Sequence, residues 1–162
     1  MTTKEFFIQT LETEKPVFVK VLKALPEDKA DYKVHERSRT AGNIAMQLAM
    51  QPVMISQIVK KGLVDFKKPY EPKDKGVKDY PGMAEKNFDQ LVKDLKATKD
   101  DDWDDTDAKL VWEGGEWPSK KFVMAWGFLF DAIHHRGQLT TFLRAMGAKV
   151  PSVYGGSADE PS

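Results

Sequence analysis

The sequence contains no cysteine. This absence excludes disulfide bonds, zinc sites built from thiolates and a cysteine nucleophile. It is also typical of proteins kept in a reducing compartment. The first residues have neither the basic start nor the long apolar run of a signal peptide. We therefore expect a cytoplasmic location.

The sequence also lacks an excess of charge of either sign and lacks long apolar runs. Lys plus Arg and Asp plus Glu both number 25, so the formal net charge is zero. Neutrality removes the usual electrostatic reason to expect a nucleic-acid or anionic-membrane partner. No stretch approaches the ~18 uncharged apolar residues that a membrane-spanning helix needs. At 162 residues, we expect one domain without nucleic-acid or membrane partners.

Apolar residues recur at three- and four-residue spacings in four segments, which is the pattern of amphipathic helices. Pro16 lies inside the first segment and must either kink that helix or sit in the first turn of a restarted one. The second helix is expected to begin near Ser38 or Thr40, both of which can cap a helix. The expected helices span residues 3–25, 38 or 40 to 62, 81–97 and 119–146.

The connections between these helices differ in length and composition. Residues 62–81 are rich in Lys, Pro, Asp and Gly and are expected to form a long surface connection. Residues 99–118 are acidic and irregular, with a weak hairpin pattern over 109–117. Residues 150–162 are expected to be a coil tail. The sequence thus predicts a single all-α domain, a four-helix bundle with a long connection between helices two and three, in which not all neighbouring helices are simple up-and-down pairs.

Several polar and aromatic features are expected to be structural. The acidic run 100–105 does not match a calcium-binding loop, because its sixth position is Asp105 where glycine is required. We expect a solvated turn there, and a surface loop at His35. Large aromatic residues of a bundle usually pack the core. Among the four tryptophans, Trp126 is the best pocket candidate because it lies five residues before Asp131.

The chemically densest segment is in the last helix. Asp131 and His135 are four residues apart and therefore share one helix face, whereas His134 lies on an adjacent flank. Asp131 and His135 can form a charge-assisted hydrogen bond, or they can bind one metal together. A metal site needs at least one further ligand from another helix.

Gln47 and Gln51 are the candidates for that ligand, because both fall on the stripe of the second helix that should face the bundle interior. A buried glutamine amide must be hydrogen-bonded or coordinated, since an unsatisfied amide costs ~1–3 kcal/mol. Hydrogen bonds to helix backbones or between the two glutamines would satisfy them equally well. Both interpretations remain open at this level.

Motifs along most of the chain resemble those of the DinB family. The segment His134-His135-Arg136-Gly137-Gln138-Leu139, followed by Phe142-Leu143-Arg144, Gly147, Val150-Pro151 and Tyr154-Gly155, is similar to the family's carboxy-terminal signature. Leu25-Pro26, Tyr32 and the segment from Arg37 to Ala45 resemble the start of its second helix.

The resemblance implies a four-helix bundle that holds a divalent metal, often nickel or zinc, with three histidines. By register those positions correspond here to Gln47, Asp131 and His135, so only His135 keeps the family's residue. The altered set supplies one imidazole, one carboxylate and one amide oxygen. Nickel and zinc prefer nitrogen donors, although Zn, Mn or Fe can still be held by an imidazole and a carboxylate. A hydrogen-bonded cluster with no metal is the alternative.

Two functions follow from this resemblance. The first is a metal-dependent enzyme, such as a transferase or isomerase that uses a low-molecular-weight thiol co-substrate, with Gln47, Asp131 and His135 holding the metal. Gln51, Trp126, His134 and Arg136 would then be pocket or supporting residues, although Arg136 also fits a surface ion pair. The second is a non-catalytic bundle that binds a small ligand or a protein. Either could be a homodimer.

Overall fold

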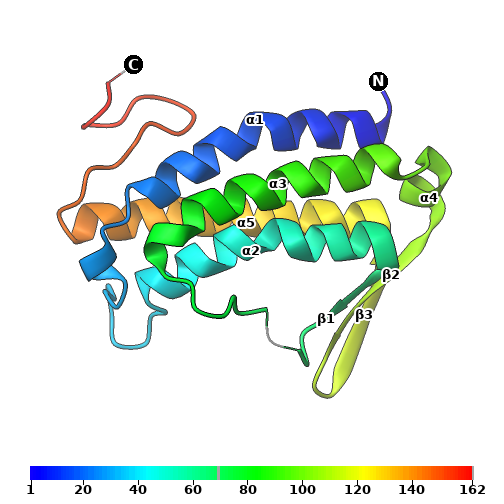
Figure 1. Cartoon of the computed structure of the whole chain (residues 1–162), viewed down its shortest axis with the longest axis horizontal. Helices are drawn as coiled ribbons and strands as arrows, with labels where there is room; N and C mark the ends of the chain where they lie inside the picture. Colours follow the sequence, from blue (N-terminus) through cyan, green and yellow to red (C-terminus); the bar gives the residue numbers. More distant parts are fainter. Residues whose placement is uncertain (69, 162) are drawn as a thin grey trace.

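The computed structural model describes residues 1–68 and 70–161. Four long helices lie side by side, and a short helix and a small sheet cover one end (Figure 1). The helices are α1 (Thr3–Lys23), α2 (Ala41–Lys61), α3 (Tyr80–Ala97), α4 (Asp100–Asp105) and α5 (Lys121–Ala145), with short 3-10 turns at Glu27–Lys29 and Val77–Asp79. The strands are β1 (Leu63–Asp65), β2 (Asp107–Trp112) and β3 (Gly115–Lys120).

The long connection between α2 and α3 determines the relative directions of these two helices. In Figure 1, α2 and α3 run in one direction, while α1 and α5 run in the other. The connection returns along the bundle, so α2 and α3 are parallel neighbours. α2 packs against both α3 and α5, and α1 packs mainly against α3. The expectation that not all neighbours alternate in direction is therefore met.

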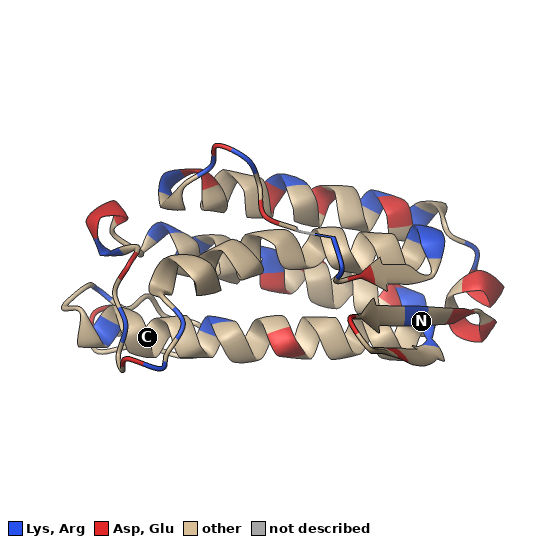
Figure 2. Cartoon of the chain, turned by 90° about the horizontal axis from the view of Figure 1, so that it is seen from below, with Lys and Arg blue, Asp and Glu red and all other residues tan. Residues whose placement is uncertain are grey.

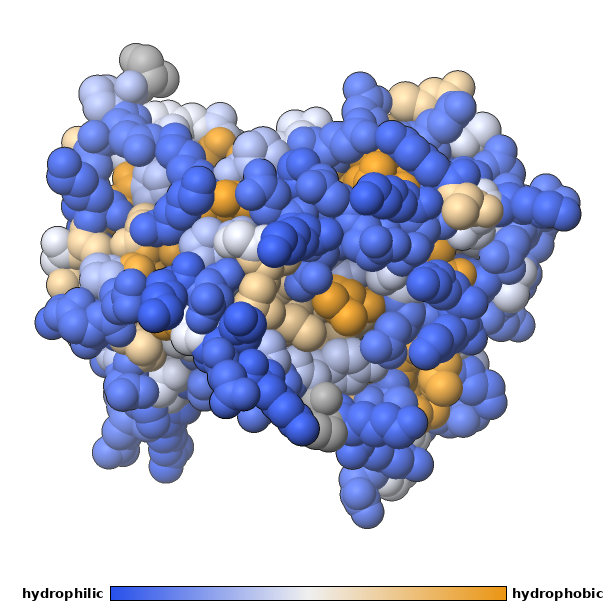
Figure 3. Space-filling view, in the orientation of Figure 1, coloured by the Kyte–Doolittle hydropathy of each residue, from blue (hydrophilic) through white to orange (hydrophobic). Residues whose placement is uncertain are grey.

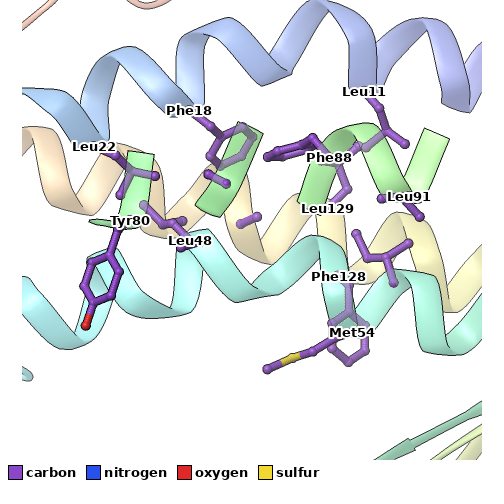
Figure 4. Packing of buried hydrophobic residues seen from close by; sticks show 14 of the residues in the cluster. Leu11, Phe18, Leu22, Leu48, Met54, Tyr80, Phe88, Leu91, Phe128 and Leu129 are labelled. Atoms are coloured by element: carbon purple, nitrogen blue, oxygen red, sulfur yellow. The ribbon is translucent and has the colours of Figure 1, made fainter. Parts of the chain in front are cut away.

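A continuous apolar core fills the space between the four long helices. The rings of Phe18 from α1 and Phe88 from α3 lie 5.2 Å apart in its centre. Figure 4 shows these rings among leucines from all four long helices, with Leu129 of α5 and Leu48 of α2 on the far side from α1. The predicted periodicity is confirmed because its apolar residues are the ones that fill this core.

Local sequence signals account for the ends of the helices. Thr2 forms a capping box with Glu5 at the start of α1. Thr40, and not Ser38, caps α2 by accepting a hydrogen bond from the backbone of Asn43. Gly62 ends α2 in the left-handed conformation, at φ 60°. α1 runs through Pro16 as one helix, so Pro16 does not start a new one.

The prediction of a purely all-α bundle was wrong, because the chain also forms a three-stranded sheet. The expected hairpin is longer than residues 109–117, and its strand β2 also pairs in parallel with β1. Val64, Leu110 and Trp117 lie opposite one another across the three strands. β1 has only three residues and its partner lies more than forty residues later, so neither periodicity nor a turn signal reveals the pairing.

The acidic run 100–105 is helix α4, and not the expected solvated turn. Its Trp103 is fully buried and donates a hydrogen bond through Nε1 to the Thr3 hydroxyl. Its Asp102 accepts hydrogen bonds from the buried ammonium of Lys121, at 2.8 and 3.0 Å, and the same ammonium donates to the carbonyl of Val59. α4 therefore joins α1, α2 and α5 at one end of the bundle.

The carboxy-terminal segment has no helix or strand up to residue 161, as predicted, but it is fastened to the bundle. Asp159 accepts hydrogen bonds from Arg144 and from the Val150 backbone, and Glu160 forms an ion pair with Lys20 at 2.5 Å. Hydrogen bonds from Lys20 and Ser152 lower the pKa of Glu160 to about 2. None of the helices in the described residues is long and apolar enough to cross a membrane.

The ion pair between Lys121 and Asp102 should make the free energy of unfolding depend on pH in the acid range. The hydrogen bond from Lys121 lowers the pKa of Asp102 below its ordinary value. The ion pair therefore contributes its full stabilisation at pH values above the unfolded-state pKa of about 3.9. This contribution declines as the pH falls below that value. We expect Asp102→Asn to lower the free energy of unfolding at pH 7 by about 1 kcal/mol, a modest loss because Asp102 is half exposed.

Urea unfolding of the wild type and Asp102→Asn at pH 7 and pH 3 measures this effect. Asp101→Asn is the matched control, because Asp101 is exposed and its side chain makes no hydrogen bond within the described residues. An equal loss in both variants would contradict a specific role for Asp102.

Candidate functional site

A pocket of about 380 Å³ lies between α2, α5 and the segment that follows β1. Most of its exposed wall is apolar, but seven of its twelve lining residues are polar or charged. The lining residues are Arg39, Met46, Gln47, Met50, Gln51, Met54, Phe66, Lys68, Tyr70, Glu71, Phe128 and Asp131. A concave, apolar surface with few convergent polar groups is the usual form of a small-molecule site.

Asp131 is the carboxylate that α5 contributes to this pocket, and two glutamine amides from α2 hold it in place. The Nε2 atoms of Gln47 and Gln51 donate to Asp131 Oδ2 at 2.8 and 3.1 Å. Gln51 is only 2% exposed and also donates to the carbonyl of Phe128 at 2.9 Å. Because the two glutamines lie four residues apart, one face of α2 presents both amides to α5.

Arg39 determines which way the Gln47 amide is turned. Its guanidinium donates to Gln47 Oε1 and to the carbonyl of Asn43. A guanidinium can only donate and a carboxylate can only accept, so the Gln47 oxygen faces Arg39 and its NH₂ faces Asp131. Hydrogen bonds therefore run in one direction, from Arg39 through Gln47 to Asp131.

His135 completes the cluster on the α5 side. Its Nδ1 lies 2.9 Å from Gln138 Oε1, and its Nε2 lies 3.4 Å from Asp131 Oδ1. Which ring nitrogen carries the proton depends on the imidazole tautomer, and in either tautomer His135 links Gln138 to Asp131. The Asp131 side chain is 47% exposed, so its carboxylate is accessible to a ligand.

A divalent metal fits only part of this arrangement. Two ligands at about 2.1 Å from a tetrahedral ion lie about 3.4 Å apart, which matches the Asp131–His135 separation. Gln47, the expected third ligand, instead donates to Asp131 and has its oxygen engaged by Arg39. No cluster of three or more His, Asp or Glu side chains suited to a metal occurs in the described residues. The residues present thus do not fit the three-ligand metal centre that the family resemblance implies.

The other predicted site residues lie outside the pocket lining. His134 is exposed on the outer face of α5. Trp126 packs against Phe6 and Phe7 of α1, with ring centroids 5.7 and 4.9 Å away. The structure therefore brings Gln47, Gln51, Asp131 and His135 together and leaves Trp126 apart from them. The ring of His134 lies beside that of His135, with centroids 5.1 Å apart, and neither histidine is in the pocket lining.

Arg136 is an ion-pair partner, but the expected surface position was wrong. Its side chain is 1% exposed and forms an ion pair with Glu14 of α1. It also donates to the Tyr154 hydroxyl at 2.5 Å and lies over the Phe18 ring. Burial, followed by the hydrogen bond to Glu14, raises the pKa of Tyr154. This cluster stabilises the bundle on the α1 side of α5, away from the pocket.

Sequence reasoning missed most of the pocket wall. Met46, Met50 and Met54 follow one another at four-residue spacing, which could have indicated a soft apolar stripe beside the two glutamines. Phe66 and Tyr70 lie in the long connection, where no pattern points to α5. Burial raises the pKa of Tyr70, whose hydroxyl donates to Gln57 at 2.7 Å.

Comparisons with known proteins agree with this architecture. The model of the DinB family matches residues 1–162. A DinB-like protein from Bacillus cereus is similar in structure, with a TM-score of 0.70 at 21% identity over 93% of this chain and 97% of that one. A DinB-like protein from Bacillus subtilis (YjoA) has a TM-score of 0.69 at 17% identity, over 90% and 96% of the two chains. No curated protein matches this sequence.

The hydrogen bonds of the buried Gln51 amide should contribute to the free energy of unfolding. Gln51→Leu removes both hydrogen bonds that join α2 to α5 at the pocket floor, so we expect the free energy of unfolding to fall by about 1–2 kcal/mol. Urea denaturation measures the change. The exposed Gln9→Leu serves as control and should stay within about 0.5 kcal/mol of the wild type. An unchanged Gln51→Leu stability would show that these hydrogen bonds do not hold the floor together.

Proposed function

The chain belongs to the DinB family, and from this premise we propose that it binds a small molecule in the pocket between α2 and α5, with Asp131 as the polar anchor. The observation that carries the proposal is the orientation of Asp131. Two amides donate to its Oδ2 atom, while Oδ1 lies 3.4 Å from His135 Nε2 and the side chain is 47% exposed. A carboxylate fixed in this way beside an apolar surface is suited to orienting a ligand.

The chemistry of the site restricts the ligand. A carboxylate accepts hydrogen bonds only, so the ligand must bring a donor, such as an ammonium, amide, hydroxyl or thiol group. The three methionines and the rings of Phe66 and Phe128 would contact its apolar part. Methionine side chains adapt to irregular shapes, so the pocket should accept ligands whose apolar parts differ in shape. The thiol co-substrate expected from the family resemblance meets both requirements.

A second candidate function is the metal-dependent enzyme, such as a thiol-dependent transferase or isomerase. The 3.4 Å separation between His135 Nε2 and Asp131 Oδ1 favours it, because one ion could join these two atoms. The protein would then supply two ligands, and water or the substrate would complete the coordination. Nickel, zinc, manganese and iron are the metals to test.

Matched probes can test the role of Asp131. Hexylamine, hexanol and hexanethiol carry one apolar chain with three different donors, and hexanoate carries an anion instead. We expect hexylamine to raise the melting temperature of the wild type more than hexanoate does, because Asp131 attracts the ammonium and repels the carboxylate even though Arg39 and Lys68 also line the pocket. A probe at a hundredfold excess over its Kd stabilises the fold by ~2.7 kcal/mol.

The Asp131→Asn variant should lose the preference for hexylamine while keeping the shape of the pocket. The exposed Asp101→Asn should retain it. If hexanoate and hexylamine stabilise the wild type equally, Asp131 is not the anchor.

The metal hypothesis has its own measurement. Thermal unfolding is followed while Ni²⁺, Zn²⁺, Mn²⁺ or Fe²⁺ is added to the wild type, to His135→Ala and to the loop control His35→Ala. A metal-dependent enzyme requires stabilisation that His135→Ala abolishes and His35→Ala preserves. Equal responses of all three proteins would reject the metal hypothesis and leave the ligand-binding proposal standing.

A further inference from the structure

The pocket between α2 and α5 continues into a second compartment farther along α2. This second compartment has a volume of about 430 Å³. Met50, Lys68, Tyr70 and Glu71 line both compartments, so the two form one groove. Asp131 lines only the first compartment, and the second is available to another part of the same ligand.

The length of α2 beside this groove carries no charge until its last turn. From Ala41 to Val59 the helix contains no Lys, Arg, Asp or Glu, and Lys60 and Lys61 then follow. In Figure 2, α2 lies between the charged α3 at the top and α5 at the bottom, and it is tan along most of its length. Figure 3 shows that the face formed mainly by α1 and α3 is hydrophilic, so this lack of charge is particular to α2.

The far end of the groove presents hydrogen-bond donors, whereas the Asp131 end presents an acceptor. The Tyr70 hydroxyl donates to Gln57 Oε1 at 2.7 Å, which leaves the NH₂ group of Gln57 to donate elsewhere. Lys61 lies one turn later on the same face of α2, and its exposed ammonium forms no ion pair within the described residues. Two donors on one wall, one of them charged, favour an anionic partner.

The carboxylates of the second compartment do not cancel these donors. Asp65 Oδ1 accepts a hydrogen bond from the backbone of Lys67 at 3.0 Å, and its Oδ2 lies 3.9 Å from the ammonium of Lys68. Glu71 lines both compartments and therefore lies in the shared part of the groove. Lys61 lines only the second compartment, so its positive charge lies at the end away from Asp131.

Helix geometry gives the distance between the two ends. Gln47 and Gln51, which hold Asp131, precede Gln57 and Lys61 by ten residues each. At the rise of an α-helix, ten residues correspond to about 15 Å along the axis. A ligand that contacts both ends must therefore be elongated.

We propose that the groove binds a linear amino acid whose ammonium and carboxylate are separated by a long uncharged chain. The proposal rests on the role of Asp131 as the anchor and adds the opposite end of the ligand. Asp131 accepts from the ammonium, and Gln57 and Lys61 donate to the carboxylate. The uncharged chain lies along α2 against Met50 and Val53, which line the groove between these ends.

Isothermal titration calorimetry with 12-aminododecanoate and its methyl ester tests the far end. Both probes carry the ammonium, but only the acid carries an anion that can reach Lys61. We expect the wild type to bind the acid at least about tenfold more tightly than the ester. Lys61→Gln should abolish this preference. Lys60→Gln is the matched control and should keep it, because the Lys60 ammonium lies 3.8 Å from Asp94 of α3, outside the groove.

A shorter probe tests the length of the groove. 6-Aminohexanoate is too short for its ammonium to contact Asp131 while its carboxylate contacts Lys61. We therefore expect 6-aminohexanoate and its methyl ester to bind the wild type with equal affinity. Circular dichroism checks that the variants are folded, which is expected because Lys60 and Lys61 are both exposed.

Equal affinities of the wild type for 12-aminododecanoate and its ester would overturn the proposal, and so would a preference that survives in Lys61→Gln. A preference for the acid at the short length would show that the far end lies elsewhere. Asp131→Asn separates these failures from that of the proposed function. If Asp131→Asn weakens both long probes while the acid shows no advantage, only the far end is wrong. If the long probes and hexylamine all fail to bind the wild type, both proposals are wrong.

Discussion

At the contact between α2 and α5, the amide nitrogen of Gln51 donates to the carbonyl of Phe128 and to the carboxylate of Asp131. This buried amide links the backbone of one helix to the side chain that forms the centre of the pocket. Because polar groups without partners are costly in a core, the position of α5 relative to α2 is restricted to arrangements that keep both hydrogen bonds. The orientation of Asp131, and hence the chemistry of the pocket, depends on this restriction.

The sides of α5 make different contacts. Its core side is apolar, and Arg136 on the α1 side forms an ion pair with Glu14. Asp131 lines the pocket beside α2, and His135 lies next to it one turn later. The remaining exposed side carries no charged residue between residues 123 and 141. One helix can carry these separate surfaces because residues three and four apart fall on one face while their neighbours fall on others. The long connection after β1 then closes the pocket, because Phe66 packs against Phe128 of α5 and the Tyr70 hydroxyl donates to Gln57 of α2.

The hydrogen bonds of Gln47 and Asp131 determine the nature of the site. The amide of Gln47 donates to the carboxylate, so its nitrogen is not available as a metal ligand. Arg39 reinforces that orientation, because its guanidinium must face the amide oxygen. The cluster is therefore satisfied largely by its own hydrogen bonds, and the accessible part of the Asp131 carboxylate is what remains for a ligand.

The sequence by itself determined the helices, since apolar spacing, Thr40 and Gly62 act locally, and the i, i+4 relation placed Asp131 beside His135 on one face. It also placed Gln47 and Gln51 on one stripe of α2. Only the tertiary structure decided that β1 pairs with a hairpin far along the chain, that Asp102 neutralises a buried Lys121, and that Arg39 turns the Gln47 amide. These features join residues distant in sequence, and no periodic pattern encodes a contact that forms only when separate elements pack together.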